Sequence, residues 1–548
     1  QSANVAIINL KTHTADVVNV GYKPQQSVLS EDENTLYVGC NDYIAVIDVD
    51  NKVMIGKIGR GANRMELLKN DSLLVYSSTK RGFGFANIHS YKEICHLDIP
   101  YKPYSLKVSS DEKFLFLAAE EQNLIYVASV NQMKIVRTIK VADGTNPDPV
   151  MDIWVEKNKI AGLISEKTSL PNFKRIVVDS NFMKGYQVKT ADINGDLKQD
   201  IIAVSDRLPE IYWYENPTWE KHLITNKSFR NIDVAPNDID GDGDIDLALA
   251  TRFDLNKPKE GGYVYWLENP QNNTTQWDMH FIDSIPTSHR IRWADLDGDG
   301  QKELLNIPLI GYGAYKPGYN QAALVRAYRI PKGPKWQLWP QIQINNQMHM
   351  IHGVSVVRWD NDLRDDFLTA SFEGVNLFQS TCDFNQYSWK VANLTAGKSG
   401  ERPENGSSEV SIGKIQYSKP FIATIEPWHG NEVVVYLSAN DNSGTWKRMV
   451  IDDTFDNGHA IACTDLNFDG NDEIIAGFRG KPYNLFIYQF ESESNSWQKI
   501  PLDEGGMSAA GIAVFDYNDD GFPDIVACGS ATGNVILYEN LKSKIFRK

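Results

Sequence analysis

The sequence has few cysteines, no long apolar run and a shortage of positive charge. Its five cysteines among 548 residues are too few and too scattered for a disulfide framework, so we expect mostly small buried thiols. No apolar run reaches the length of about 20 residues that a membrane-spanning helix needs. The net charge is −16, which argues against a nucleic-acid partner because phosphate binding requires a basic surface.

A recognisable leader segment is also lacking. Gln1 is followed at once by a strand-like run, as in a chain that has already been trimmed. The lack of a leader therefore does not argue against secretion.

What the sequence does contain is a short acidic loop that recurs in its C-terminal two thirds. Five copies place oxygen-bearing side chains at positions 1, 3, 5 and 9, a spacing that suits the oxygen ligands calcium prefers. The flanking runs are β-like and no Glu stands at position 12, so the loops are not EF-hands. Solvated aspartate turns are the alternative, and we expect one or two copies to be empty. The predicted ligands are Asp192, Asn194, Asp196, Asp200, Asp238, Asp240, Asp242, Asp246, Asp295, Asp297, Asp299, Glu303, Asp465, Asn467, Asp469, Glu473, Asp516, Asn518, Asp520 and Asp524.

A sixth copy, "RWDNDLRDD", has Arg358 at the first ligand position. A cation there repels a metal ion, so we expect this copy to bind none.

Each acidic loop is followed by the same order of strand-like runs. An apolar run such as "LALAT" leads to an aromatic one such as "VYWLEN", and then to a run with a Trp near its start. Four strands per unit and seven units between residues 184 and 548 predict an all-β fold, a seven-bladed β-propeller with four-stranded antiparallel blades. The fifth unit, around 407–451, keeps its strands but has lost the acidic loop.

Residues 1–180 form a different region with shorter repeats and no acidic loops. Three segments each read as three strands joined by turns, and strand pairs at 4–20 and about 148–164 could close together as a fourth blade. We therefore expect a smaller or partial β-propeller region here, and the sequence does not decide whether it closes into a ring.

The repeat also predicts which side chains meet at the axis of the ring. The acidic loop joins the innermost strand to the second, so residues before the innermost strand and after the second strand converge on the opposite face. Counting six residues back from each loop gives Tyr186, Ile232, His289, His352, His459 and Ala510. The second set contains Arg207, Arg252, Arg479, Glu426, Trp428 and His429. Three histidines on one register favour a functional pocket.

Two chemistries remain open for this pocket. His289, His352, His429 and His459 could bind zinc or another divalent ion beside Glu426 or Glu409, or act as general acid and base without metal. Nearby arginines, Arg290 and Arg479 among them, suit a carboxylate or a developing oxyanion, as would Arg207, Arg230 and Arg252. Trp428 offers a flat face for a sugar ring.

Three family resemblances add to this interpretation. The acidic loops resemble the FG-GAP or VCBS repeats of integrin heads and many secreted proteins, which implies structural calcium and a secreted, periplasmic or cell-surface location. Residues 1–180 resemble YVTN-type propeller repeats. The segments "HRIRWADLDGDGQKELL", "GSSEV", "IEPWHG" and "GGMSAAG" resemble the propeller domain of the aldos-2-ulose dehydratase group, which implies metal-assisted elimination of water from an oxidised sugar.

Three functions remain. The first is a carbohydrate-active lyase or dehydratase that acts by β-elimination with metal, histidine or arginine assistance. The second is a non-catalytic glycan- or protein-binding propeller at the cell surface, since this fold hosts many functions. The third is a scaffold that uses residues 1–180 for protein contacts. Clustered histidines favour the first, because a binding module does not need them.

Overall fold

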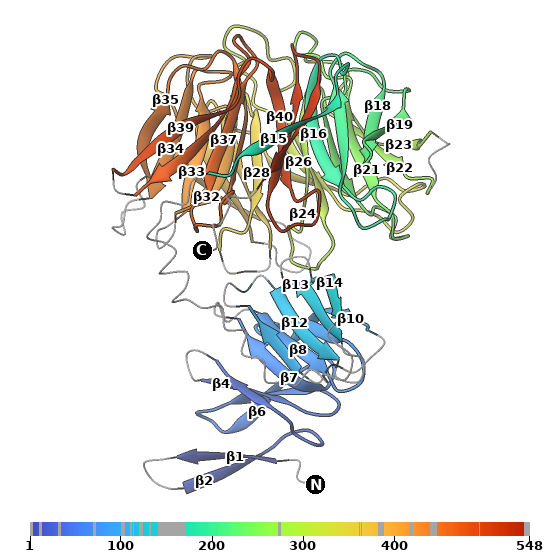
Figure 1. The fold of residues 1–548 in the computed structure, drawn as a ribbon. Coiled ribbons are helices and arrows are strands. Elements are labelled where there is room, and N and C mark those ends of the chain that lie inside the picture. The colour runs from blue at the N-terminus through green and yellow to red at the C-terminus, as the bar shows by residue number, and fades with distance from the viewer. Residues whose placement is uncertain are drawn as a thin grey trace. The chain divides into compact units, whose positions relative to one another are not determined.

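The structure is a computed structural model that describes residues 4–9, 14–30, 34–68, 73–99, 103, 105–109, 112, 114–119, 124–130, 133–140, 170–271, 276–360, 362, 364–381, 388–415, 420–438, 446–492 and 494–541. Every regular element in these ranges is a β-strand, which confirms the all-β class (Figure 1). The chain divides into two compact units, residues 1–165 with 360–363 and residues 166–359 with 364–548.

The described residues of the second unit form seven four-stranded antiparallel sheets. In order along the chain, their strands are β16–β19 (Gly185–Ala191, Asp200–Ser205, Ile211–Glu215, Glu220–Thr225), β20–β23 (Asp233–Asn237, Asp246–Thr251, Tyr263–Glu268, Asp278–Ser284), β24–β27 (Ser288–Ala294, Glu303–Pro308, Val325–Tyr328, Gln341–Asn345), β28–β31 (Gly353–Val357, Asp366–Ser371, Gly374–Ser380, Trp389–Thr395), β32–β35 (Glu409–Lys414, Pro420–Glu426, Glu432–Ser438, Trp446–Asp452), β36–β39 (Gly458–Thr464, Glu473–Phe478, Leu485–Glu491, Ser496–Asp503) and β40–β42 (Ala509–Phe515, Asp524–Gly529, Val535–Asn540) with β15 (Phe173–Asp179).

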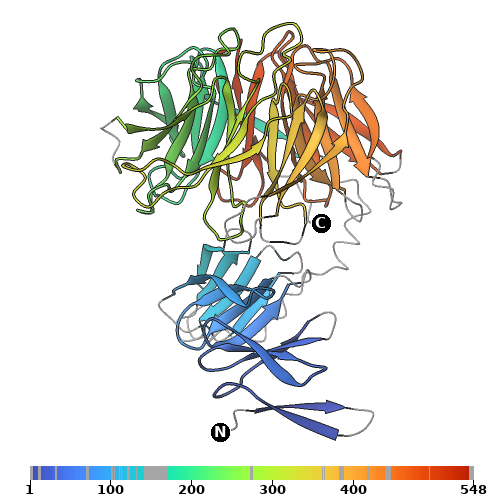
Figure 2. The ribbon, with the colours of Figure 1, turned by 180° about the vertical axis from the view of Figure 1, so that it is seen from behind.

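These sheets are arranged radially as a β-propeller. Each innermost strand contacts the innermost strand of the next sheet, from β16 through β20, β24, β28, β32 and β36 to β40 and back to β16 (Figures 1 and 2). The ring closes where β15 pairs with β42, so that one sheet combines strands from both ends of the unit. Because β15 belongs to this sheet, the unit begins at residue 166, before the expected start at 184.

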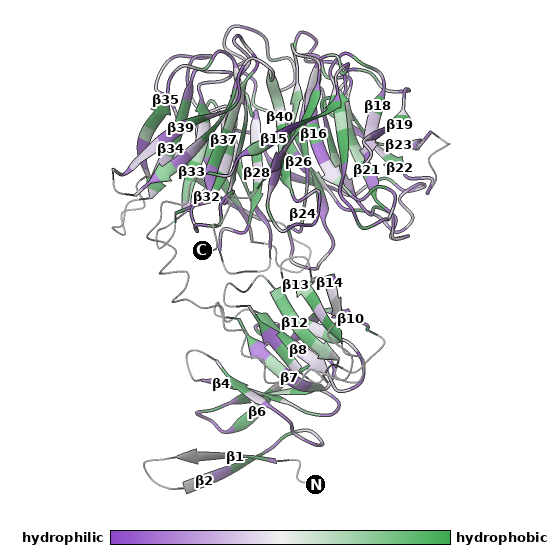
Figure 3. Cartoon of the chain, in the orientation of Figure 1, coloured by the Kyte–Doolittle hydropathy of each residue, from purple (hydrophilic) through white to green (hydrophobic). Residues whose placement is uncertain are grey.

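The second strand of each sheet is an almost unbroken run of apolar residues because it is buried. The second strand of each sheet is packed on both faces by neighbouring sheets, and all six residues of Asp246–Thr251 are buried. Its Leu247 and Leu249 pack with Ile202 and Val204 of the preceding sheet. The outermost strands have one exposed face, and Asp278–Ser284 contains both exposed and buried residues. In Figure 3, hydrophobic residues gather along the strands and hydrophilic residues lie along many connections.

Asparagines that follow the third strand join neighbouring sheets at their acidic loops. The Asn269 side chain donates to the carbonyl of Ile193 in the loop of the preceding sheet (3.0 Å) and to that of Ile245 in its own (3.1 Å). Asn216 and Asn540 make the equivalent pairs of bonds in their own sheets. The final Asn of the repeated "YEN" and "LEN" sequences is therefore a bridge between sheets.

The described residues of the first unit form one strand pair and three four-stranded sheets. The pair is β1 and β2 (Asn4–Asn9, Thr14–Asn19), and the sheets are β3–β6 (Ser27–Leu29, Thr35–Gly39, Ile44–Asp48, Val53–Ile58), β7–β10 (Ala62–Leu67, Leu73–Ser78, Phe83–Asn87, Lys92–Leu97) and β11–β14 (Ser105–Val108, Phe114–Ala119, Leu124–Ser129, Lys134–Lys140).

Each of the three predicted segments contains its three strands, as expected, and each sheet also has a first strand that the prediction did not include. These first strands are short or mix polar with apolar residues, as in Ala62–Leu67, and so lack the apolar run that marks the others. The predicted partner pair at 148–164 lies outside the described residues, as does Cys382. Cys40 and Cys528 are buried, Cys95 and Cys463 are partly buried, and all four are free thiols.

We expect the substitution Asn269→Ala to lower the free energy of unfolding by about 1–3 kcal/mol, because it leaves two carbonyls at the sheet boundary without their donor. Denaturant unfolding of the full chain measures this. The control is Asn256→Ala, at an exposed position. Equal stability of the two variants would contradict the bridging role.

Candidate functional site

The acidic loops connect the first and second strands of their sheets and share one hydrogen-bonding scheme. The carboxylate at position 1 accepts backbone N–H groups within the loop, as Asp238 does from Gly241 (2.8 Å) and Gly243 (3.2 Å). Both glycines have positive φ, of 81° and 98°, which the tight turn requires. The carboxylate at position 9, here Asp246, accepts from Ile239 N–H (3.1 Å) at the start of the loop.

The position 9 carboxylates are buried and close to other acids. Burial, with neighbouring carboxylates adding to it, raises the pKa of Asp200, Asp246 and Asp524 to about 7 and that of Glu473 to about 9. Glu473 Oε1 is buried without a hydrogen-bond partner in the described part of the chain. Such a site favours a bound cation, which would keep the carboxylates ionised.

Two of the loops bring their oxygens especially close together. Asp238, Asp240 and Asp246 each offer an oxygen within 4.8 Å of the others. The same holds for a second set at positions 1, 3 and 5, namely Asp295, Asp297 and Asp299. These oxygen-only donor sets fit a hard cation such as Ca²⁺.

Arginines supply an internal cation to two of the loops. The Arg329 guanidinium contacts Asp297 and lies 3.5 Å from Glu303. In the degenerate copy, Arg358 forms an ion pair with Asp365 (3.3 Å), and the absence of a metal from this copy stays a prediction.

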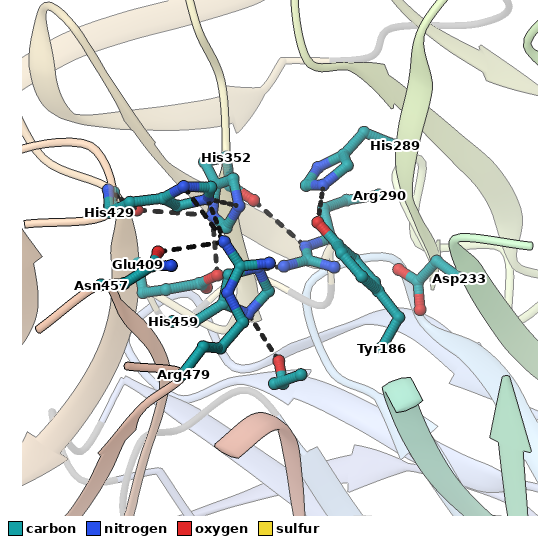
Figure 4. A network of polar contacts seen from close by, with 12 residues as sticks. Tyr186, Asp233, His289, Arg290, His352, Glu409, His429, Asn457, His459 and Arg479 are labelled. Carbon is teal, nitrogen blue, oxygen red and sulfur yellow. Dashed lines mark hydrogen bonds and ion pairs between the residues drawn. The ribbon is translucent and has the colours of Figure 1, made fainter. Parts of the chain in front are cut away.

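A cluster of aromatic and imidazole rings lies at the opposite ends of the innermost strands from the loops. Tyr186 on β16, His289 on β24, His352 before β28 and His459 on β36 meet His429 from the turn between β33 and β34 (Figure 4). The ring centroids of His352 lie 4.8 Å from those of His289, His429 and His459. We call these five residues the axial cluster. The structure thus brings together the histidines that the repeat register predicted.

Hydrogen bonds at Nδ1 fix the orientation of two of the imidazoles. His459 Nδ1 lies 2.6 Å from the Ala510 carbonyl oxygen, which only accepts, so Nδ1 carries the proton. His459 Nε2 is left with its lone pair, buried and without a partner among the described residues. His352 Nδ1 lies 2.8 Å from Glu409 Oε1, and its Nε2 is 3.1 Å from His429 Nε2.

One nitrogen each from His352, His429 and His459 lies within 4.8 Å of the other two. Converging imidazole nitrogens, with Nδ1 held by an acceptor on two of the three rings, form the arrangement that protein metal ligands use. The three side chains therefore fit a divalent ion such as Zn²⁺.

Burial sets the protonation state of the cluster. Desolvation lowers the pKa of each cluster histidine well below its usual value, and nearby positive charge adds to this effect, from Arg290 at all four rings and from Arg479 at every ring except that of His289. The imidazoles are thus neutral near pH 7, the form that binds metal or accepts a proton. Burial also raises the pKa of Tyr186 to about 12, and its hydroxyl lies 2.8 Å from His289 Nε2.

A layer of charged residues supports the cluster. Arg290, which is 1% exposed, donates to Glu409 Oε1 (3.0 Å) and to the His352 carbonyl (3.1 Å). Glu409 in turn holds His352 Nδ1, while Arg292 pairs with Asp233. Burial raises the pKa of Glu409 to about 7 although Arg290 opposes this. Arg290 is therefore a positioning residue that is already paired.

Not every candidate from the sequence lies in the cluster. The Glu426 carboxylate is turned away and accepts from Ser407 (2.9 Å), Thr424 (2.9 Å), Tyr436 (2.8 Å) and Arg448 (2.7 Å). The other outlying candidates are arginines and apolar residues: Arg207 and Arg252 are exposed, Arg230 pairs with Asp254 (2.9 Å), and Ile232 and Ala510 are buried apolar side chains.

Sequence reasoning undervalued Glu409 and missed Tyr319. Glu409 opens the innermost strand of the sheet without an acidic loop, where "GSSEV" was the available signal. Tyr319 comes from the long connection between β25 and β26, and its ring lies 5.9 Å from Trp428 in an edge-on arrangement. Trp428 lies 4.6 Å from His429. The Tyr319 hydroxyl and Trp428 Nε1 are buried and unpartnered in the described residues.

Few side chains at the axial cluster and its edge reach solvent. His289, His352 and His459 are at most 1% exposed, whereas Trp428, His429 and Arg479 are half-buried. A ligand would therefore approach the imidazoles along these three side chains.

Comparisons with known proteins match two parts of this chain. Residues 261–439 match the model of the aldos-2-ulose dehydratase β-propeller domain, and residues 192–249 match an FG-GAP-like repeat. The first match contains His289, His352, Glu409 and His429. The predicted resemblances to the aldos-2-ulose dehydratase propeller and to FG-GAP repeats are thus confirmed, whereas the resemblance of residues 1–180 to YVTN repeats stays a prediction.

A particular relative is aldos-2-ulose dehydratase from Phanerodontia chrysosporium. It is 27% identical to this chain over 290 residues, which cover 48% of this chain and 31% of the relative. The chain thus spans about a third of the relative's length.

We expect Glu409→Ala to destabilise the protein by about 3–5 kcal/mol, because Arg290 would remain buried without its counter-charge. Replacing both partners, as Glu409→Leu with Arg290→Met, removes that charge and is expected to recover most of the loss. Urea unfolding of both variants tests the ion pair. A double variant as unstable as Glu409→Ala would show that the pair is not what supports this layer.

Proposed function

We propose that the protein is a carbon–oxygen lyase that eliminates water, or another oxygen leaving group, from a sugar or oxidised sugar at the axial cluster. The observation that carries the proposal is the convergence of His352, His429 and His459, with His459 Nε2 unpartnered among the described residues, beside the bonded pair Tyr186 and His289. The similarity of this region to aldos-2-ulose dehydratase supports a carbohydrate substrate.

β-Elimination places three demands on a site. A base removes the proton next to a carbonyl, the electron pair of the C–H bond forms the C=C bond, and the C–O bond breaks at the neighbouring carbon. The departing oxygen takes up a proton and leaves as water or an alcohol. A site therefore needs a base, a group that stabilises the enolate, and an acid.

The chain's own residues meet the acid and base requirements. His289 is neutral, its Nε2 is hydrogen-bonded to the Tyr186 hydroxyl, and its Nδ1 has no hydrogen-bond partner among the described residues. In the tautomer with the proton on Nε2, Nδ1 accepts the proton from carbon, the Tyr186 hydroxyl donates its proton to the departing oxygen, and Nε2 passes its proton to the Tyr186 oxygen. Tyr186 keeps its proton at neutral pH because burial raises its pKa to about 12. We assign proton transfer to this pair, and positioning to Arg290 and Glu409.

His352, His429 and His459 would hold the divalent metal, Zn²⁺ or another, in this proposal. Such an ion, when bound, polarises the substrate carbonyl and stabilises negative charge on its oxygen. The unpartnered His459 Nε2 and the Nδ1 bond of His352 to Glu409 support a metal site here.

A non-catalytic glycan-binding propeller is the second candidate. It is favoured by the unpartnered Trp428 Nε1 and Tyr319 hydroxyl, which could recognise sugar hydroxyls beside an aromatic face. Such a module binds without turnover and tolerates loss of single histidines.

The remaining proposals concern calcium, location and partners. We propose structural Ca²⁺ in the acidic loops, a secreted, periplasmic or cell-surface location, and protein contacts through YVTN-like repeats in residues 1–180. Among the described residues, no helix has the length and apolarity to span a membrane.

We expect His352→Ala and His459→Ala each to lower kcat for elimination by about 100-fold or more, with folding retained. Formation of the unsaturated product is followed by its ultraviolet absorbance, and bound metal by elemental analysis. The control is His280→Ala, whose ring pairs with Glu268 outside the cluster.

Unchanged turnover in both cluster variants would refute the proposed reaction. Glycan binding that persists in them without any turnover in the wild type would instead support the second candidate.

We expect calcium to raise the melting temperature, with a stabilisation of about 2.7 kcal/mol per site at a free concentration about 100 times Kd. Calorimetry with chelator and then with added Ca²⁺ measures the shift. Asp240→Asn should reduce it. Asp360→Asn, in the copy that carries Arg358, should not, and an equal effect of both variants would count against specific loop sites.

A further inference from the structure

Arg479 is an unpaired guanidinium at the edge of the axial cluster. It follows β37 directly, and its Nη2 donates to Asn457 Oδ1 (3.0 Å) and lies 3.2 Å from His429 Nδ1 (Figure 4). Its Nε is buried without a hydrogen-bond partner among the described residues. No carboxylate in that part of the chain forms an ion pair with it.

Three other buried or half-buried arginines in the described part of this unit have acidic partners. Arg290 pairs with Glu409, Arg292 with Asp233, and Arg448 with Glu426 and Glu432. Arg479 therefore departs from the rule that shielded charges are paired. Asp206 influences its pKa from a distance, but forms its ion pair with Arg207 (3.8 Å).

The charges around the cluster do not balance. The cations that interact across it are Lys189, Arg290, Arg292 and Arg479, and the acids are Asp206, Asp233 and Glu409. With all three acids ionised, four positive charges stand against three negative ones, and Asp206 is itself paired with Arg207. An anionic ligand next to Arg479 would reduce this excess and satisfy Nε.

We infer that the sugar bound at this site carries an anionic group, a carboxylate or a phosphate ester, that Arg479 binds through its Nε edge. A guanidinium offers two parallel N–H donors to such a group, which gives both affinity and orientation. The inference rests on the proposed function in taking the ligand to be a sugar, and it names the substrate class.

The surroundings of Arg479 suit this role. Its backbone is held by its own N–H bond to the Asn457 carbonyl (3.0 Å) and by the bond from Ser508 Oγ to its carbonyl (2.7 Å). The guanidinium lies beside His429, whose ring is 4.6 Å from that of Trp428. An anion on Arg479 would thus place a sugar ring near both the imidazoles and an aromatic face. Arg479 acts as a specificity-determining residue.

The test is calorimetric titration of the full chain with glucuronate, glucose 6-phosphate and glucose, in the presence of chelator and after addition of Zn²⁺. We expect one or both anions to bind about tenfold or more tightly than glucose, since hydrogen bonds to charged groups are the stronger ones. The two anions distinguish a carboxylate from a phosphate substrate. Arg479→Gln should abolish the preference, and Arg479→Lys, which keeps the charge but not the paired donors, should retain part of it.

The control variant is Arg252→Gln, an exposed arginine that contacts Tyr263, and it should keep the full preference. Thermal unfolding checks that each variant is folded. The inference is overturned if neither anion is preferred over glucose, or if the preference survives in Arg479→Gln. A preference that chelator removes and Arg479→Gln does not would assign the anion to a metal.

The two proposals fail separately in these experiments. An anion preference that depends on Arg479, without any elimination activity, would remove the lyase proposal and keep this inference. Elimination from neutral sugars, without any preference for anions, would remove this inference and keep the lyase proposal.

Discussion

The structure of the second unit depends on burial of the second strand of every sheet between its neighbours. That burial forces seven sheets into a ring, and the ring brings residues of equal register on the innermost strands to one axis. Three histidines from different sheets therefore meet, although more than fifty residues separate each from the next. The neutral state of these imidazoles follows from the same burial. Charged groups near the axis are retained because partners such as Glu409 and Asp233 accompany them.

Much of this was accessible from the sequence because the acidic loop marks the register. Counting back from the loop predicted that Tyr186, His289, His352 and His459 converge, and the ring distances agree. The same count cannot choose between residues where the loop is missing. In that sheet the sequence left Glu426, at the end of β33, and Glu409, at the start of β32, as alternative acids, and Glu409 is the one that holds His352. Strand alternation, which sequence counting cannot fix without a marker, turns Glu426 toward Arg448 instead.

The remaining features depend on long connections and on pairing, which no local pattern specifies. Tyr319 reaches Trp428 from a connection without repeat periodicity, so its place could not be predicted. Arg290 and Arg479 are both arginines near the cluster, but only the structure shows that Arg290 is paired and that Arg479 is not. In the first unit, weakly patterned first strands concealed the four-stranded nature of each sheet. The sequence pattern therefore predicts where side chains gather. The ion pairs and hydrogen bonds seen in the structure decide which of these side chains can bind a ligand.

The central claim is that the imidazoles of His352, His429 and His459 face a common ligand. The most direct test is a crystal structure of the protein saturated with Zn²⁺, with anomalous diffraction recorded on both sides of the zinc absorption edge. The account predicts a peak about 2.0–2.1 Å from one nitrogen of each ring. A saturated crystal with zinc bound elsewhere, and with no zinc between these three rings, would contradict it.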